Sequence, residues 1–317
     1  MGVDRRRLPD RRRDNHPYWS LPRGRVLLRA LRSEPMQEYL LLIPSAARLD
    51  APVLVCVHGI SRNASEQARV FASVCEHRGI ILVVPVFTVE QNKDYQRLGR
   101  RGRGSRTDLL LNRCLAEVAS LSGADVTQFR LFGFSGGAQF AHRYMMAHPE
   151  RVARAVFVAA GWYTFPDHRQ RYPFGIRPGR SLPDISFNPA RFLRVPAQVL
   201  VGQEDTRASS LRKNKRLDAL QGRNRIERAR NWVASMHKLS AQHEIEPCIA
   251  LTEVPDADHS FGRFCARGAL VERVIAFLID ADPQVHHRTL PTPVTPLHPP
   301  DVPIDDRAVA SNDGAQA

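Results

Sequence analysis

The chain has 317 residues, and its 46 lysines and arginines exceed its 32 aspartates and glutamates, which gives a formal net charge of +14. A hydrophobic fraction of 43% with 25% charged residues excludes a chain that is disordered throughout. No apolar run approaches the roughly 18 residues of a membrane helix, and the first residues lack the apolar stretch of a signal peptide. We therefore expect a cytoplasmic protein without a membrane span.

The pattern of apolar runs predicts an α/β fold with a mostly parallel eight-stranded sheet flanked by helices. Short runs rich in Val, Ile and Leu, which are typical of buried parallel strands, alternate with segments of helical length. The first two runs look like an antiparallel pair that opens the sheet. The predicted strands cover residues 26–31, 38–44, 53–57, 80–85, 129–134, 155–160, 198–201 and 249–254.

Helices are predicted between these strands. Asn63 with Glu66 resembles a capping box for a helix that runs to about residue 77, where Gly79 stops it. The other predicted helices cover residues 107–121, 136–147, 227–241 and 263–279. Residues 161–194 fit no regular element, so they are predicted to be an irregular insertion after the sixth strand.

The ends of the chain differ in composition from its middle. Residues 1–22 are arginine-rich without apolar periodicity, which predicts a basic flexible arm. Residues 282–317 hold 7 of the 23 prolines and predict a Pro-rich disordered tail. The folded domain is expected to span residues 23–281.

The positive charge gathers in three places. Residues 1–32 hold ten arginines against three aspartates, residues 97–106 hold five arginines, and residues 211–230 hold eight basic residues against two acidic ones. No basic segment interleaved with aromatics indicates a specific nucleic-acid partner. We expect the segment from residue 211 to form a solvent-facing helix, whereas the loop over residues 97–106 is either solvated or able to attract anionic substrates.

The cysteines are odd in number, widely spaced and mostly embedded in apolar segments. They form neither a CxxC metal motif nor a disulfide framework. We expect reduced core residues and no metal or cofactor. The five are Cys56, Cys75, Cys114, Cys248 and Cys265.

The strongest chemical signal is a G-x-S-x-G motif over residues 133–137, between a predicted strand and a predicted helix. A serine on such a tight turn is exposed at the edge of the sheet, and the flanking glycines allow strand and helix to approach. Ser135 would also lie at a helix N-terminus, where free N–H groups stabilise a developing oxyanion. The motif predicts a nucleophilic serine.

A serine hydroxyl needs a base and an orienting carboxylate to act as a nucleophile. Asp205 follows the strand that ends near residue 201, and His259 follows the last strand, in the order serine, acid, histidine. His259 would take the proton from Ser135, and Asp205 would hold the imidazole tautomer.

Other acidic residues and a second histidine compete for these roles. Glu204 is an alternative orienting acid, while Asp256 and Asp258 are expected to shape the turn before His259. His58 lies upstream of the serine in VHGI, so we expect it to hold its loop.

The loop after His58 is expected to complete an oxyanion hole. Gly136, the residue after the nucleophile, would supply one N–H, and Ile60, or alternatively Ser61, the second.

The motifs VCVHGIS, GFSGGAQFAHRY, LVGQEDT and DADHSF, in this order, resemble the α/β-hydrolase family over about residues 25–279. The H-G followed by a nonglycine residue resembles the branch of dienelactone hydrolases, feruloyl esterases and polyhydroxybutyrate depolymerases. A serine nucleophile departs from dienelactone hydrolases. The resemblance implies nucleophile Ser135, acid Asp205, base His259 and oxyanion donors Ile60 and Gly136.

Trp162 and Tyr163 follow the sixth strand and are predicted to bind substrate. The alternative is that the aromatic rings of the insertion pack it onto the domain. We expect a carboxylesterase that acts on a small-molecule ester through an acyl-enzyme. Amide or peptide hydrolysis, acyl transfer, and a non-catalytic hydrolase-like protein that binds anionic partners are the alternatives, and the sequence does not predict an oligomeric state.

Overall fold

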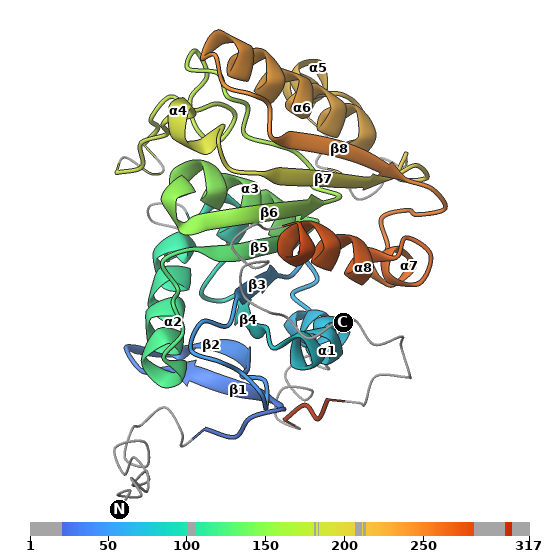
Figure 1. The fold of residues 1–317 in the computed structure, drawn as a ribbon. Helices are drawn as coiled ribbons and strands as arrows, with labels where there is room; N and C mark the ends of the chain where they lie inside the picture. Colours follow the sequence, from blue (N-terminus) through green and yellow to red (C-terminus); the bar gives the residue numbers. More distant parts are fainter. Residues whose placement is uncertain are drawn as a thin grey trace, which may run out of the picture.

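A computed structural model describes residues 21–99, 105–180, 182, 184–206, 211, 214–281 and 302–305. Its centre is the predicted eight-stranded sheet, in the order β1-β2-β4-β3-β5-β6-β7-β8 (Figure 1). β2 pairs antiparallel with β1 and β4, and every other pairing is parallel. The strands are β1 (Val26–Leu31), β2 (Glu34–Leu42), β3 (Val53–Val57), β4 (Ile81–Val86), β5 (Phe129–Phe134), β6 (Val152–Val158), β7 (Ala197–Gly202) and β8 (Ile249–Val254).

The helices follow the predicted alternation closely. The Asn63 side chain accepts a hydrogen bond from the N–H of Glu66 at the start of α1, and Gly79 ends that helix in the left-handed conformation. The helices are α1 (Ala64–Arg78), α2 (Thr107–Ser122), α3 (Gly136–Ala147), α4 (Pro189–Phe192), α5 (Lys215–Gln221), α6 (Arg225–Gln242), α7 (Phe261–Ala266) and α8 (Leu270–Ile275), with the short 3-10 helices η2 (Tyr95–Arg97) and η3 (Pro149–Arg151) and the π-helix η4 (Ala276–Asp280), which continues α8.

The sheet is covered on both faces, which explains why its central strands are apolar throughout. Val53, Val55 and Val57 of β3 belong to the core cluster shared with α2, α3 and α6. Leu54 and Cys56 belong to the cluster shared with α1, α7 and α8. The alternation of side chains along one strand thus joins two hydrophobic layers.

The single helix predicted over residues 263–279 is wrong. α7 ends at Ala266 and α8 begins at Leu270, because Ala269 adopts a left-handed backbone with φ of 46° that no helix can include. A Cβ at Gly268 would meet the carbonyl oxygen of Phe264 at 2.7 Å, so the chain turns tightly there. Gly268 was the feature of the sequence that could have predicted this break between the two helices.

The insertion over 161–194 is irregular as predicted, apart from the short helix α4. Its first residues are tied to the helices beneath. The side-chain amide of Gln221 bonds to both the N–H and the carbonyl of Tyr163, at 2.9 and 2.7 Å. The Trp232 indole donates to the carbonyl of Thr164 at 2.8 Å. These bonds fix the backbone that leaves β6 at the edge of the sheet.

A segment from the predicted tail is ordered. The N–H of Val26 donates to the carbonyl of Pro303 at 2.9 Å, and the N–H of Asp305 donates to the carbonyl of Val26 at 3.1 Å. Val302 and Ile304 pack against the core cluster on the α1 side of the sheet. Residues 302–305 therefore lie beside the start of β1, where Ile304 forms an isolated parallel bridge with Val26. The rest of the predicted tail, like residues 1–20 of the predicted arm, lies outside the described residues.

No helix among the described residues is long and apolar enough to cross a membrane. All five cysteines are free thiols, of which Cys56, Cys75 and Cys114 are buried.

Candidate active site

Ser135 lies on a strained turn between β5 and α3. Its backbone has φ of 52° and ψ of −109°, outside the regions that a non-glycine residue ordinarily adopts. The turn exists because α3 packs directly on the sheet: a Cβ at Gly137 would overlap the carbonyl oxygen of Val57 in β3. The strain and the close approach together hold the serine hydroxyl at the carboxyl end of the strands.

The structure brings Ser135, His259 and Asp205 into one hydrogen-bonded series. Ser135 Oγ lies 3.0 Å from Nε2 of His259, and the other ring nitrogen of His259, Nδ1, lies 3.0 Å from Oδ2 of Asp205. If Nδ1 carries the proton, it donates to the carboxylate, and Nε2 is left to accept from the serine hydroxyl. The ring of Phe134 stacks on His259 at 5.6 Å between centroids.

The second oxygen of Asp205 is held by an arginine that the sequence did not point to. Nη1 of Arg225 donates to Oδ1 of Asp205 at 2.9 Å, and both side chains are buried, with 3% and 1% of their surfaces exposed. Arg225 is the first residue of α6, and the Asn224 side chain caps that helix by accepting from the N–H of Glu227. Burial lowers the pKa of Arg225 below its ordinary value, and the neighbouring Asp205 carboxylate partly opposes this change.

The prediction of a solvent-facing basic segment from residue 211 is therefore wrong for part of it. Arg228 is also buried and bonds to the carbonyls of Gly161 and Gly222 and to Asp218. The carboxylates that neutralise these arginines come from elsewhere in the fold or from the preceding helix, so a count of local charge could not reveal the burial.

None of the competing acidic residues is recorded in contact with His259. Glu204 is exposed. Asp258 accepts from the N–H of Ser260 at 2.9 Å and pairs with Arg263, at the start of α7. Asp256 has φ of 54° in the turn after β8. Asp256 and Asp258 both lie in the turn that carries His259, as the sequence analysis predicted.

His58 holds its loop by both ring nitrogens. Nδ1 donates to the carbonyl of Gly59 at 2.9 Å, and Nε2 accepts from the N–H of Phe87 at 3.0 Å. Burial lowers the pKa of His58 to about 4, so the ring is neutral at pH 7. The Tyr95 hydroxyl donates to the carbonyl of His58 at 3.0 Å and fixes the same loop to η2.

The Ile60 backbone adjoins the turn that carries the serine. A Cβ at Gly136 would lie 3.1 Å from the Ile60 nitrogen, 2.7 Å from Ile60 Cγ2 and 2.5 Å from the Tyr95 hydroxyl. Only glycine fits in this space. The two peptide units named by the sequence analysis as oxyanion donors are thus neighbours beside Ser135.

A cavity of about 270 Å³ opens next to Ser135. Trp162 lines it, whereas Tyr163 does not: the Tyr163 ring stacks on Trp232 at 4.8 Å and is buried in the core. The two adjacent rings therefore have different surroundings, and Trp162 is the one beside the cavity. The lining residues are Ile60, Lys93, Asp94, Gln96, Arg97, Ser135, Gln139, Gly161, Trp162 and Arg225.

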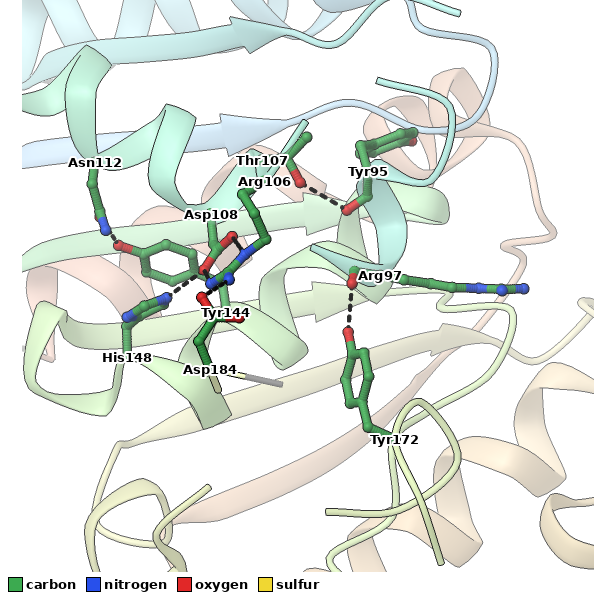
Figure 2. Close-up of polar contacts among 10 residues, drawn as sticks. All are labelled: Tyr95, Arg97, Arg106, Thr107, Asp108, Asn112, Tyr144, His148, Tyr172 and Asp184. Carbon is green, nitrogen blue, oxygen red and sulfur yellow. Dashed lines mark hydrogen bonds and ion pairs between the residues drawn. The ribbon is translucent and has the colours of Figure 1, made fainter. Parts of the chain in front are cut away.

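The two described ends of the basic segment 97–106 have different surroundings. Arg97 lines the cavity, while Arg106 pairs with Asp108 and Asp184, as Figure 2 shows. His148 bonds to the same Asp108 at 2.8 Å. Residues 100–104 of this loop lie outside the described residues.

Solved structures resemble this protein in fold. No protein-family model and no curated protein matches the sequence. The structure is similar to poly(aspartic acid) hydrolase-1 from Sphingomonas sp. KT-1, with a TM-score of 0.67 and 24% identity over 80% of this chain and 100% of that one. It is also similar to LpqC, a poly(3-hydroxybutyrate) depolymerase from Bordetella parapertussis, with a TM-score of 0.64 and 24% identity over 79% of this chain and 86% of that one.

A more distant likeness is to an S-formylglutathione hydrolase from Agrobacterium tumefaciens, with a TM-score of 0.51 and 15% identity over 80% of this chain and 94% of that one. The sheet order and these likenesses define a protein with the α/β-hydrolase fold. The resemblance in the sequence is thereby confirmed at the level of the fold.

Proposed function

We propose that the protein is a serine hydrolase that cleaves carboxylic esters through an acyl-enzyme. The observation that carries the proposal is the unbroken hydrogen-bonded series from Ser135 through His259 to Asp205. An isolated serine is a poor nucleophile, and this series supplies the base and the orienting carboxylate that it needs.

The reaction follows from these contacts. Ser135 Oγ attacks the ester carbonyl carbon while its proton passes to Nε2 of His259, and the tetrahedral intermediate collapses as the imidazolium returns the proton to the departing alkoxide. A water molecule then repeats the sequence on the acyl-enzyme, and its proton is returned to Ser135 Oγ when the acid is released. Asp205 stabilises the transient positive charge on His259.

The developing oxyanion needs donors at a fixed place. The N–H groups of Ile60 and Gly136 are proposed for this role, because their peptide units adjoin beside Ser135 and Gly136 begins a helix. The strained backbone of Ser135 supports the same proposal, since strain of this kind is typical of functional residues.

Amide hydrolysis is the second candidate function, and acyl transfer would use the same residues. One of the two most similar structures described above is named a poly(aspartic acid) hydrolase and the other a poly(3-hydroxybutyrate) depolymerase, so the likenesses include a polyamide and a polyester as named substrates. A parallel panel of 4-nitrophenyl esters and 4-nitroanilides separates the two bond types.

The proposal is tested by replacing Ser135, which should remove the residue that forms the covalent intermediate. Ser135→Ala should reduce release of 4-nitrophenol from a short-chain ester to the background rate and abolish labelling by a fluorophosphonate probe. Ser235→Ala is the matched control, because the Ser235 hydroxyl bonds only to a carbonyl of its own helix at 2.6 Å. Undiminished turnover in Ser135→Ala would contradict the proposal. Absent turnover in the wild-type protein would favour a non-catalytic protein that binds anionic partners.

A further inference from the structure

The cavity beside Ser135 carries an excess of positive charge. Its lining includes the cations Lys93, Arg97 and Arg225 and one acidic residue, Asp94. The charge of Arg225 is matched by Asp205. Among the described lining residues, Lys93 and Arg97 then exceed Asp94 by one formal positive charge, in a partly enclosed space where charge acts more strongly than in open water.

A second layer of positive charge lies directly behind the lining. Arg143 in α3 is completely buried, and its Nη1 donates to the carbonyls of Gln96 at 2.7 Å and Gln139 at 2.9 Å, both of which line the cavity. Its Nε donates to the Thr164 hydroxyl at 2.9 Å, and its guanidinium lies over the Trp162 ring at 4.1 Å.

No carboxylate among the described residues pairs with this guanidinium, and its Nη2, although buried, has no hydrogen-bond partner there. Burial lowers the pKa of Arg143 to about 9; the nearby Tyr172 opposes this change and Arg97 adds to it. Arg143 therefore remains a cation at pH 7. A buried cation without an anion costs free energy, and an anion in the adjoining cavity would offset that cost.

The backbone of Arg97 is fixed beside the cavity, where its side chain can contact such an anion. Its carbonyl accepts from the Tyr172 hydroxyl at 2.6 Å, and the carbonyl of Tyr95 accepts from Thr107 Oγ1 at 3.3 Å. In Figure 2 the Arg97 side chain extends away from the acidic group around Asp108. Its guanidinium lies 5.5 Å from the centroid of the Trp162 ring.

We propose that this cavity binds a carboxylate carried by the substrate, with Arg97 and Lys93 as the residues that determine specificity. Arg143 supports the positive potential from behind Trp162. The preferred substrates are then half-esters of short dicarboxylic acids, because a planar guanidinium binds a carboxylate through two parallel hydrogen bonds and the cavity of about 270 Å³ admits a short chain. The inference rests on the proposed hydrolase function.

The experiment compares charged and neutral forms of one acyl chain. The mono-4-nitrophenyl esters of succinate, glutarate and adipate are each paired with the corresponding methyl 4-nitrophenyl diester, in which a methyl ester replaces the free carboxylate. The measure is kcat/KM of the charged half-ester divided by kcat/KM of the neutral diester. In the wild-type protein the charged member of at least one pair should be favoured by about tenfold or more, the usual size of a charge-assisted hydrogen bond.

The variants assign that preference to residues. Arg97→Gln should reduce the ratio by about tenfold, and Lys93→Gln by a smaller factor, because a flexible ammonium forms no bidentate pair. Arg48→Gln is the matched control: it removes the same charge from an arginine that is 74% exposed and paired with Asp50, and should leave the ratio unchanged. Free glutarate should also inhibit the wild-type protein competitively, and glutaramide should not, which tests the site without any variant.

The two proposals fail in different ways. If no 4-nitrophenyl ester of either charge is hydrolysed, the hydrolase proposal is wrong. If the neutral diesters are hydrolysed at least as well as the half-esters in all three pairs and glutarate does not inhibit, the hydrolase proposal stands and the carboxylate site is refuted. An equal loss of ratio in Arg48→Gln and Arg97→Gln would likewise refute it, because general surface charge would then explain the preference.

Discussion

The buried pair between Arg225 and Asp205 can be tested against a second pair on the same helix. Arg230, also in α6, bonds to Glu253 through two nitrogens at 2.6 and 2.8 Å, yet its side chain is 58% exposed. Arg225 and Asp205 are 3% and 1% exposed. The exposed pair has two such bonds and the buried pair is joined through Nη1 of Arg225 at 2.9 Å, so a larger contribution of the buried pair to stability would come from its burial.

Arg225→Gln should therefore lower the free energy of unfolding by about 3–5 kcal/mol, because it leaves the Asp205 carboxylate buried without a cation. For a chain of this size, at roughly 2 °C per kcal/mol, that loss corresponds to a decrease in Tm of about 6–10 °C. Arg230→Gln should produce no measurable change, since exposed pairs are screened by water. Thermal unfolding followed by circular dichroism measures both.

A double-mutant cycle separates the pair from the loss of packing. Asp205→Asn together with Arg225→Gln removes both charges, so the double variant should be less destabilised than the sum of the single variants. The same Arg225→Gln protein should lose about tenfold to a hundredfold in kcat/KM, because Asp205 would no longer be held from both sides. A Tm within about 2 °C of wild type, or additive single effects, would refute the reasoning.

Two further predictions concern the turn and the loop beside the site. Gly137→Ala should abolish activity and lower Tm by several degrees, because its Cβ would overlap the Val57 carbonyl and force α3 from β3; a crystal structure or melt indistinguishable from wild type would contradict this. His58 has a pKa of about 4 in the folded protein, below its ordinary value of about 6.5. The unfolded chain therefore binds a proton that the folded protein does not between these values, so stability should fall as pH decreases from about 6.5 towards 4. Urea midpoints that stay constant between pH 7 and 5 would argue against it.

The residues that follow strands were the most predictable part of the site. Ser135 directly follows its apolar strand, Asp205 and His259 come a few residues after theirs, and parallel strands bring their carboxyl ends to one edge of the sheet. Order along the chain and the glycines around the serine were then enough to select them. The same reasoning led to the proposal of Ile60 and Gly136 as oxyanion donors.

The residues that the sequence analysis missed have their partners far away in the chain. Arg225 lies in a basic segment and Arg143 among the mostly apolar residues FAHRYMMA of α3, and the packing of α6 and α3 on the sheet buries both. Tyr163 was predicted wrongly to line the cavity because the sequence does not indicate which of two adjacent rings faces inward. Tertiary contacts decide which ring faces the cavity, and here Tyr163 is held in the core by Gln221 and Trp232.

The short segment 302–305 has a practical consequence for anyone who shortens this chain. Its backbone bonds occupy the N–H and the carbonyl of Val26, the first residue of the edge strand β1, and its Val302 and Ile304 pack on the core cluster beneath. An expression boundary chosen after the last helix, at about residue 281, would retain every strand and helix described here and would still leave these backbone groups of an edge strand unpaired, which favours intermolecular association. A purification tag on a shortened protein therefore belongs after residue 305 rather than after η4.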